Sequence, residues 1–176
     1  MYPSVFGRTG GVAARGDNYY VYDPAAEIVE RFDRDGRVTG KFGRSGAGSV
    51  LGEADRQAVR ARLIAETPAE EHPGEMFDES PIPAQLPRYG WAGFRPRSPF
   101  VVGNDGSVWI VQYGGVHDLV PRWEVYDSAQ VFQGVVAGPE RSWLHALDQG
   151  KALLVIRDPD GVETAGVWQV PLPTQQ

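Results

Sequence analysis

The side chains of this chain that could do acid–base or metal chemistry are few and lie far apart in the sequence. The 176 residues include three histidines, His72, His117 and His145, and no cysteine. His117 directly precedes an aspartate, and such a pair could act as a general base with its acid or supply half of a metal site. His145 stands between two apolar residues, which favours a strand position with a satisfied polar group. Because the three histidines have no metal-ligand spacing, we predict no metal site and no catalytic residue.

Two acidic turns, at residues 33–36 (DRDG) and 158–161 (DPDG), begin as some calcium-binding loops do. Neither is followed by the further oxygen ligands and the closing glutamate of an EF-hand loop. Aspartate and glycine are also the residues that tight turns prefer, and this turn chemistry is the favoured interpretation. The sequence contains no dinucleotide-binding glycine motif, no phosphate loop and no hydrolase nucleophile motif, so we predict no cofactor.

Aromatic and arginine side chains gather in residues 89–97 (YGWAGFRPR), within a proline-rich connector. Such side chains are favoured anchors at interfaces, and loops on a rigid scaffold often carry binding residues. A second long connection, residues 113–121 (YGGVHDLVP), contains the histidine–aspartate pair. The candidate ligand-binding residues are therefore Tyr89, Trp91, Arg95, Arg97, Tyr113 and His117. The alternative is that the aromatic side chains only pin the connector to a neighbouring sheet.

The elements that must position these loops are short strands, and residues 98–138 contain four of them. An apolar run at 100–102 is followed by an Asn-Asp-Gly turn and by the almost continuously apolar residues 108–111. A continuous apolar strand predicts cover on both of its faces. In residues 122–126, Trp123 and Val125 alternate with more polar residues, which predicts a half-exposed strand. With the outer strand around Gly134, the pattern predicts one four-stranded antiparallel sheet, the size of a propeller blade.

The same pattern recurs along the chain. Residues 29–33 (VERFD) align without a gap with 123–127 (WEVYD). In that register Val38 meets Phe132, Gly40 meets Gly134 and Phe42 meets Val136. A third copy begins at residues 147–150, about 44 residues after the equivalent turn, which is the length of one blade.

The repeat predicts an all-β fold, a partial β-propeller of about three four-stranded antiparallel blades in a single domain over residues 1–176. The blades are expected at about 11–43, 98–138 and 141–173, with a helical and proline-rich insertion at 50–97. Within this insertion, residues 53–65 are rich in helix formers, with acids in the first turn and arginines later.

The composition of the chain limits the kinds of partner that it is expected to bind. The formal net charge of −6 argues against a nucleic-acid backbone as the main partner, and no apolar run reaches the length of a membrane span. The first residues have neither the charged nor the apolar region of a signal peptide. A chain without cysteine suits either redox compartment, so the sequence leaves the localisation open.

The segment LPRYGWAGFRPRSPFVVGNDGSVWIVQYG and the repeat RFDRDGRVTGKFG resemble the NHL-like six-bladed β-propeller proteins of bacteria, over residues 11–173 and in their C-terminal part only. The resemblance implies ligand or protein binding, often on the cell envelope, so a fragment of a typical member would be extracytoplasmic. No catalytic residue carries over from it. Closed propellers have about four to eight blades, so three blades leave exposed edges. We expect either a longer gene product or a homodimer that closes a six-bladed ring.

The favoured function is a non-enzymatic binding or scaffold module for a protein or small-molecule ligand. The alternative is a propeller hydrolase or lyase, lactonase-like, with a divalent metal in the central channel. That activity needs several Asp, Glu, Asn or His side chains from different blades that point at one place.

Overall fold

The computed structural model describes residues 10–44, 50, 52–54, 57–58, 61, 88–89, 98–112 and 120–170. Its strands form three antiparallel sheets. Sheet one contains β1 (Gly11–Arg15), β2 (Asn18–Asp23), β3 (Ile28–Phe32) and β4 (Val38–Phe42). Sheet two contains β5 (Phe100–Val102), β6 (Val108–Gln112), β7 (Arg122–Tyr126) and β8 (Phe132–Ala137). Sheet three contains β9 (Ser142–Asp148), β10 (Lys151–Arg157) and β11 (Glu163–Gln169).

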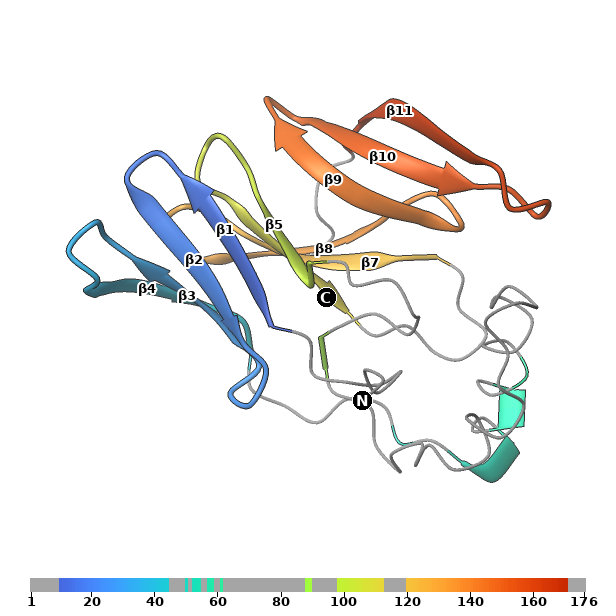
Figure 1. Cartoon of the computed structure of the whole chain (residues 1–176), viewed down its shortest axis with the longest axis horizontal. Coiled ribbons are helices and arrows are strands. Elements are labelled where there is room, and N and C mark those ends of the chain that lie inside the picture. The colour runs from blue at the N-terminus through green and yellow to red at the C-terminus, as the bar shows by residue number, and fades with distance from the viewer. Residues whose placement is uncertain are drawn as a thin grey trace, which may run out of the picture.

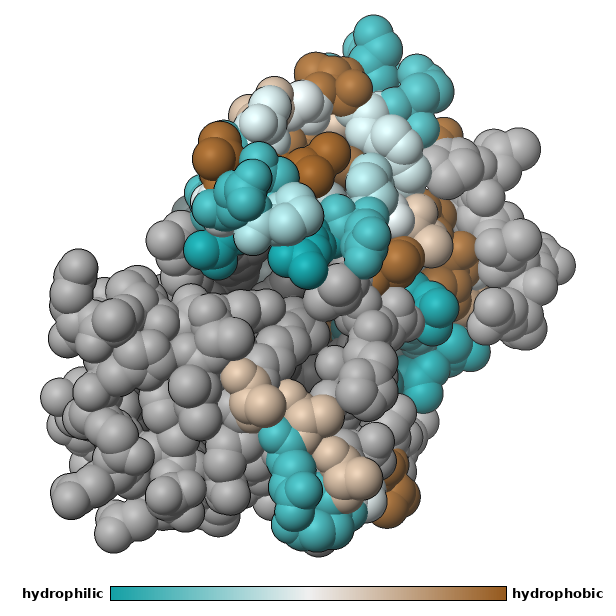
Figure 2. All heavy atoms as spheres, turned by 90° about the vertical axis from the view of Figure 1, so that its right-hand side faces the viewer, coloured by the Kyte–Doolittle hydropathy of each residue, from teal (hydrophilic) through white to brown (hydrophobic). Residues whose placement is uncertain are grey.

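The three sheets follow one another in an arc, with sheet two in the middle (Figure 1). The first strands of the sheets, β1, β5 and β9, are neighbours along the inner side of this arc. The all-β, partial-propeller-like fold that the sequence predicts is therefore confirmed. Sheet three differs from the expected four strands, because the described residues form three strands in it. Hydrophilic and apolar side chains both reach the surface in the upper part of the molecule, where this sheet lies (Figure 2).

Sheets one and two are copies in register, as the repeat predicts. The pairing of β3 with β4 shifts between Arg31 and Phe32, and the pairing of β7 with β8 shifts at the equivalent position, between Val125 and Tyr126. Each shift is a β-bulge, which adds one residue to the outer strand and bends it. Because both outer strands bend at the same place, the two sheets have the same curvature and can nest against each other.

Aspartate side chains close the equivalent turns. The Asp33 Oδ1 accepts hydrogen bonds from the backbone N–H groups of Asp35 and Arg37, each at 2.9 Å. The Asp127 Oδ1 accepts the same two bonds, from Ala129 and Val131. In the third sheet Asp158 accepts one from Val162 at 2.8 Å. Turn chemistry therefore accounts for the acidic residues at both DxDG sequences.

Two apolar cores lie between the sheets. The core between sheets one and two includes Tyr20, Tyr22, Val29, Phe42, Tyr89, Phe100, Val102, Val108, Ile110 and Tyr126. The core between sheets two and three includes Trp109, Val111, Trp123, Val125, Val136, Leu147, Ala152 and Leu154. Alternate residues of β6 enter different cores, so this strand is covered on both faces as predicted. Tyr20 and Tyr22 fill the space between sheets one and two.

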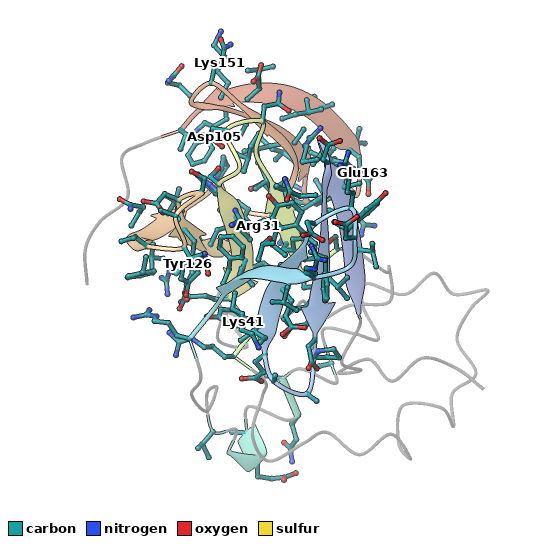
Figure 3. The ribbon with its side chains drawn as sticks, turned by 90° about the vertical axis from the view of Figure 1, so that its left-hand side faces the viewer. Arg31, Lys41, Asp105, Tyr126, Lys151 and Glu163 are labelled. Carbon is teal, nitrogen blue, oxygen red and sulfur yellow. The ribbon has the colours of Figure 1, made fainter. Side chains whose placement is uncertain are left out.

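The prediction that residues 122–126 form a half-exposed strand is wrong. Sheet one covers the face of β7 that contains Glu124 and Tyr126, and the exposed fraction of Glu124 is 0%. A further contact joins the two sheets: Nη1 of Arg31 on β3 donates to the carbonyl oxygen of Ser128, in the turn between β7 and β8, at 3.1 Å. Figure 3 labels Arg31. The polar residue Glu124, at an alternating position of β7, thus lies in the interface between sheets one and two.

The insertion between sheets one and two is described only in part. Of the predicted helix at 53–65, the described residues 53–54, 57–58 and 61 are helical. Gln57 Nε2 donates to Glu53 Oε1 at 3.4 Å, one turn away. Within the described part of the chain, we find no helix with the length and apolar character of a membrane-spanning segment.

Candidate functional site

A cavity of about 680 Å³ lies where the inner strands of the three sheets meet. Most of the residues that line it are apolar and several are aromatic, while polar atoms form a large share of the exposed wall. The lining comprises Val12, Ala13, Ala14, Arg15, Ser98, Pro99, Phe100, Val101, Val102, Trp109, Val111, Trp123, Trp143, Leu144, His145, Val155 and Glu163. Strand β5 contacts both β1 and β9, and this arrangement brings the lining residues together although they come from distant parts of the sequence.

The few polar groups of the cavity are held by hydrogen bonds. Trp143 Nε1 donates to His145 Nε2 at 3.0 Å, which orients both rings on β9. Arg15 Nε donates to the Val102 carbonyl oxygen at 3.2 Å, which ties β1 of sheet one to β5 of sheet two. An apolar wall with a few oriented polar groups is the usual composition of a small-molecule site.

The described cavity wall does not contain a donor set for a divalent metal. It offers one imidazole, from His145, and one carboxylate, from Glu163, and Arg15 adds a positive charge. Across the described residues, we find no group of three His, Cys, Asp or Glu that could hold a metal ion. The metal-dependent activity considered from the sequence needs several oxygen or nitrogen ligands at one place, and these residues do not supply them.

A second polar feature is a buried carboxylate between sheets one and two, which we call the Glu124 cluster: Arg44, Arg88, Tyr89, Gln112, Glu124 and Tyr126. Glu124 Oε1 accepts from Arg44 Nη2 at 2.9 Å, from Arg88 Nε at 3.1 Å and from Gln112 Nε2 at 2.9 Å. Glu124 Oε2 accepts from the hydroxyls of Tyr89 at 2.6 Å and Tyr126 at 2.7 Å. Both oxygens are thus fully used by donors, two of them cationic.

The local fold explains how these side chains meet. Arg44 follows β4 of sheet one, and its guanidinium carbon lies 4.1 Å from the centre of the Phe132 ring on β8. Tyr89 pairs with Gln112 at the end of β6, and its hydroxyl accepts the backbone N–H of Arg44 at 2.8 Å. The chain on either side of the insertion is therefore fastened to one carboxylate of β7.

The electrostatics keep Glu124 ionised. Burial alone would raise the pKa of Glu124, but hydrogen bonds from Arg44, Tyr89, Tyr126 and Arg88 outweigh it and lower this pKa to about 2. Burial also raises the pKa of Tyr126, and the hydrogen bonds with Tyr89 and Glu124 raise it further. A carboxylate that is saturated with donors and flanked by neutral phenols neither gives nor takes a proton at neutral pH. The cluster therefore acts as a structural contact between the sheets.

Stability is expected to fall in acid through this carboxylate. An unfolded glutamate has a pKa of roughly 4.3, whereas folded Glu124 ionises at about 2. Its contribution is complete above the unfolded value and is lost as the pH falls from there towards the folded value. We expect the difference in free energy of unfolding between the wild type and Glu124→Gln to shrink between pH 5 and about pH 2. Urea unfolding at a series of pH values measures it, and an equal difference at both ends would contradict the assignment.

Of the candidate binding residues from the sequence, the structure describes one. Tyr89 lies buried in the Glu124 cluster, which agrees with the alternative that aromatic side chains pin the connector. Trp91, Arg95, Arg97, Tyr113 and His117 lie outside the described residues. His145 is in a strand with a satisfied ring nitrogen, as predicted.

Sequence reasoning missed Glu124 and its two arginines. The one local sign was the position of Glu124 between Trp123 and Val125, and this alternation also suits a strand with one face in water. No pattern in the sequence indicated that Arg15 and Glu163 belong to one cavity, since only the assembled sheets bring them together. Comparisons with protein-family models, with curated proteins and with solved structures find no match for this chain.

Proposed function

We propose that this chain is a non-enzymatic binding module of the β-propeller type, which holds a small, largely apolar ligand in the cavity between its inner strands. The observation that carries the proposal is the cavity itself, of about 680 Å³. Small-molecule sites commonly have volumes of roughly 300–1,000 Å³ and walls of this composition. The resemblance to NHL-like propellers of bacteria is consistent with a binding role and forms part of the proposal.

The aromatic wall favours a ligand with a flat apolar part. Trp109 and Trp123 are buried, and their ring centres lie 6.3 Å apart, so this part of the wall is fixed by core packing. Trp143 is oriented by its bond to His145. Such a wall is formed before the ligand arrives, which lowers the cost of binding. The guanidinium of Arg15, one of the lining residues, adds attraction for an anionic group on the ligand.

A fluorescent aromatic anion, 1-anilinonaphthalene-8-sulfonate, can test the cavity. Tryptophan emission overlaps its absorption, so bound probe is detected by energy transfer. We expect Ala14→Phe, which adds a ring inside the cavity, to weaken probe binding about tenfold, or about 1.4 kcal/mol. The matched control is Ala129→Phe, at an exposed alanine in the turn between β7 and β8, away from the cavity wall, which should bind as the wild type does.

Thermal unfolding and near-ultraviolet circular dichroism of each variant separate loss of the site from loss of the fold. Equal probe affinity for the wild type and Ala14→Phe, with both folded, would contradict the proposal. Equal weakening by Ala14→Phe and Ala129→Phe would contradict it too, because binding would then not depend on the cavity.

A further inference from the structure

Sheets one and two each contact the following sheet with the same face. Tyr20, Tyr22 and Phe42 of sheet one point into the core shared with sheet two. Their equivalents in the repeat, Trp109, Val111 and Val136 of sheet two, point into the core shared with sheet three. We call this side of a sheet its forward face and the opposite side its backward face. The chain thus makes one kind of contact twice, a forward face against the backward face of the following sheet.

None of the described sheets lies against the backward face of sheet one. On sheet two the same positions are filled by Phe100, Val108 and Ile110, which sheet one buries, the last two to an exposed fraction of 0%. On sheet one, the register of β1 and β2 places Val12, Tyr19 and Val21 there. These side chains are exposed, with 71% of Val12 and 52% of Tyr19 accessible. Equivalent apolar residues of the repeat are therefore buried in sheet two and exposed on sheet one.

On sheet three it is the forward face that none of the described sheets covers. Ala152 and Leu154 of β10 point back into the core with sheet two. Leu153 therefore lies on the forward face, where it pairs with Val167 of β11. Both are exposed, Val167 to 72%. The described sheets thus leave one uncovered forward face and one uncovered backward face, and both are apolar at their centres.

We propose that a second copy of this chain covers these surfaces, with the forward face of sheet three in each copy against the backward face of sheet one in the other. The contact repeats the geometry that the chain already uses twice internally. A head-to-tail contact of this kind closes into a ring when the rotation allows it. Two copies with the three described sheets each supply six, a number within the four to eight blades of closed propellers. Two copies are therefore the expected assembly.

Sedimentation equilibrium over a range of concentrations tests the assembly with two variants. Tyr19→Arg places a charge on the backward face, and Val167→Arg places one on the forward face. We expect the wild type to reach twice the 19.3 kDa chain mass, and each variant alone to remain at the chain mass. In an equimolar mixture, the intact forward face of Tyr19→Arg can meet the intact backward face of Val167→Arg. The mixture should therefore associate at lower concentrations than either variant alone.

The control is Val131→Arg, an exposed valine in the turn before β8, where the equivalent residue of sheet one is Arg37. It should associate as the wild type does. A wild type that stays at the chain mass throughout overturns the proposal. A mixture that is no more associated than its components also overturns the proposal. In that case the contact would join two identical faces, or no contact would form. Dissociation of the control overturns it as well, since added charge alone would explain the loss.

Discussion

Replacing Glu124 by glutamine is expected to lower the free energy of unfolding by about 3 kcal/mol at neutral pH. The substitution removes the charge that compensates Arg44 and Arg88, and it turns an amide N–H towards groups that are themselves donors. Arg44 and Arg88 are partly exposed and can regain some hydration, which places the loss at the lower end for a broken buried ion pair. Urea unfolding monitored by tryptophan fluorescence measures the change.

The repeat supplies a matched control for this variant. Glu30 occupies the position equivalent to Glu124, but it is partly exposed and pairs with Lys41 at 2.8 Å. Exposed pairs of this kind contribute about 0–1 kcal/mol, so Glu30→Gln should change the free energy of unfolding by less than about 1 kcal/mol. Equal effects of the two substitutions would show that burial and the second arginine add nothing at Glu124.

Replacing Trp123 by alanine is expected to cost about 3–5 kcal/mol, because it removes a large buried side chain from the core between sheets two and three. The ring packs near Trp109 and directly under the backbone, where a Cβ at Gly138 would lie 2.5 Å from it. The neighbouring strands cannot close the space, since Trp123 is fixed on β7 between two other sheets. Thermal and urea unfolding should both show the loss.

Trp168→Ala is the comparison for that prediction. Trp168 packs against the same core from β11, the edge strand of sheet three, and is only partly buried. Less apolar surface is lost and the edge can adjust, so the cost should be well below that of Trp123→Ala. If the two substitutions had equal effects, the core between sheets two and three would not depend on the central tryptophan.

The strands could be predicted from the sequence because their signals are local. Gly36 and the aspartates around it mark a turn by their own backbone preferences, and this turn fixes where the next strand begins. The repeat could be found because equivalent residues, such as Gly40 and Gly134, occupy the same place beside the same bulge. The continuous apolar stretch of β6 correctly indicated a strand between two sheets.

The Glu124 cluster and the cavity could not be predicted because they depend on which face meets which. Alternation in β7 has the same appearance whether the polar face meets water or a pair of arginines. Arg44 and Arg88 are distant from Glu124 in the sequence, and nothing local connects them. Arg15 and His145 likewise become neighbours of one cavity only after the three inner strands converge.

The two arginines on Glu124 also define a place where the polypeptide can change in length. Arg44 and Arg88 meet at one carboxylate, and the Arg44 N–H reaches the Tyr89 hydroxyl at 2.8 Å, so the chain between them leaves and returns at a single anchored point. The entropic cost of closing such a loop grows only logarithmically, by about 0.6 kcal/mol for each doubling of its length. Evolution or a designer could therefore shorten, extend or replace this stretch at little thermodynamic cost, as long as the anchor itself is kept.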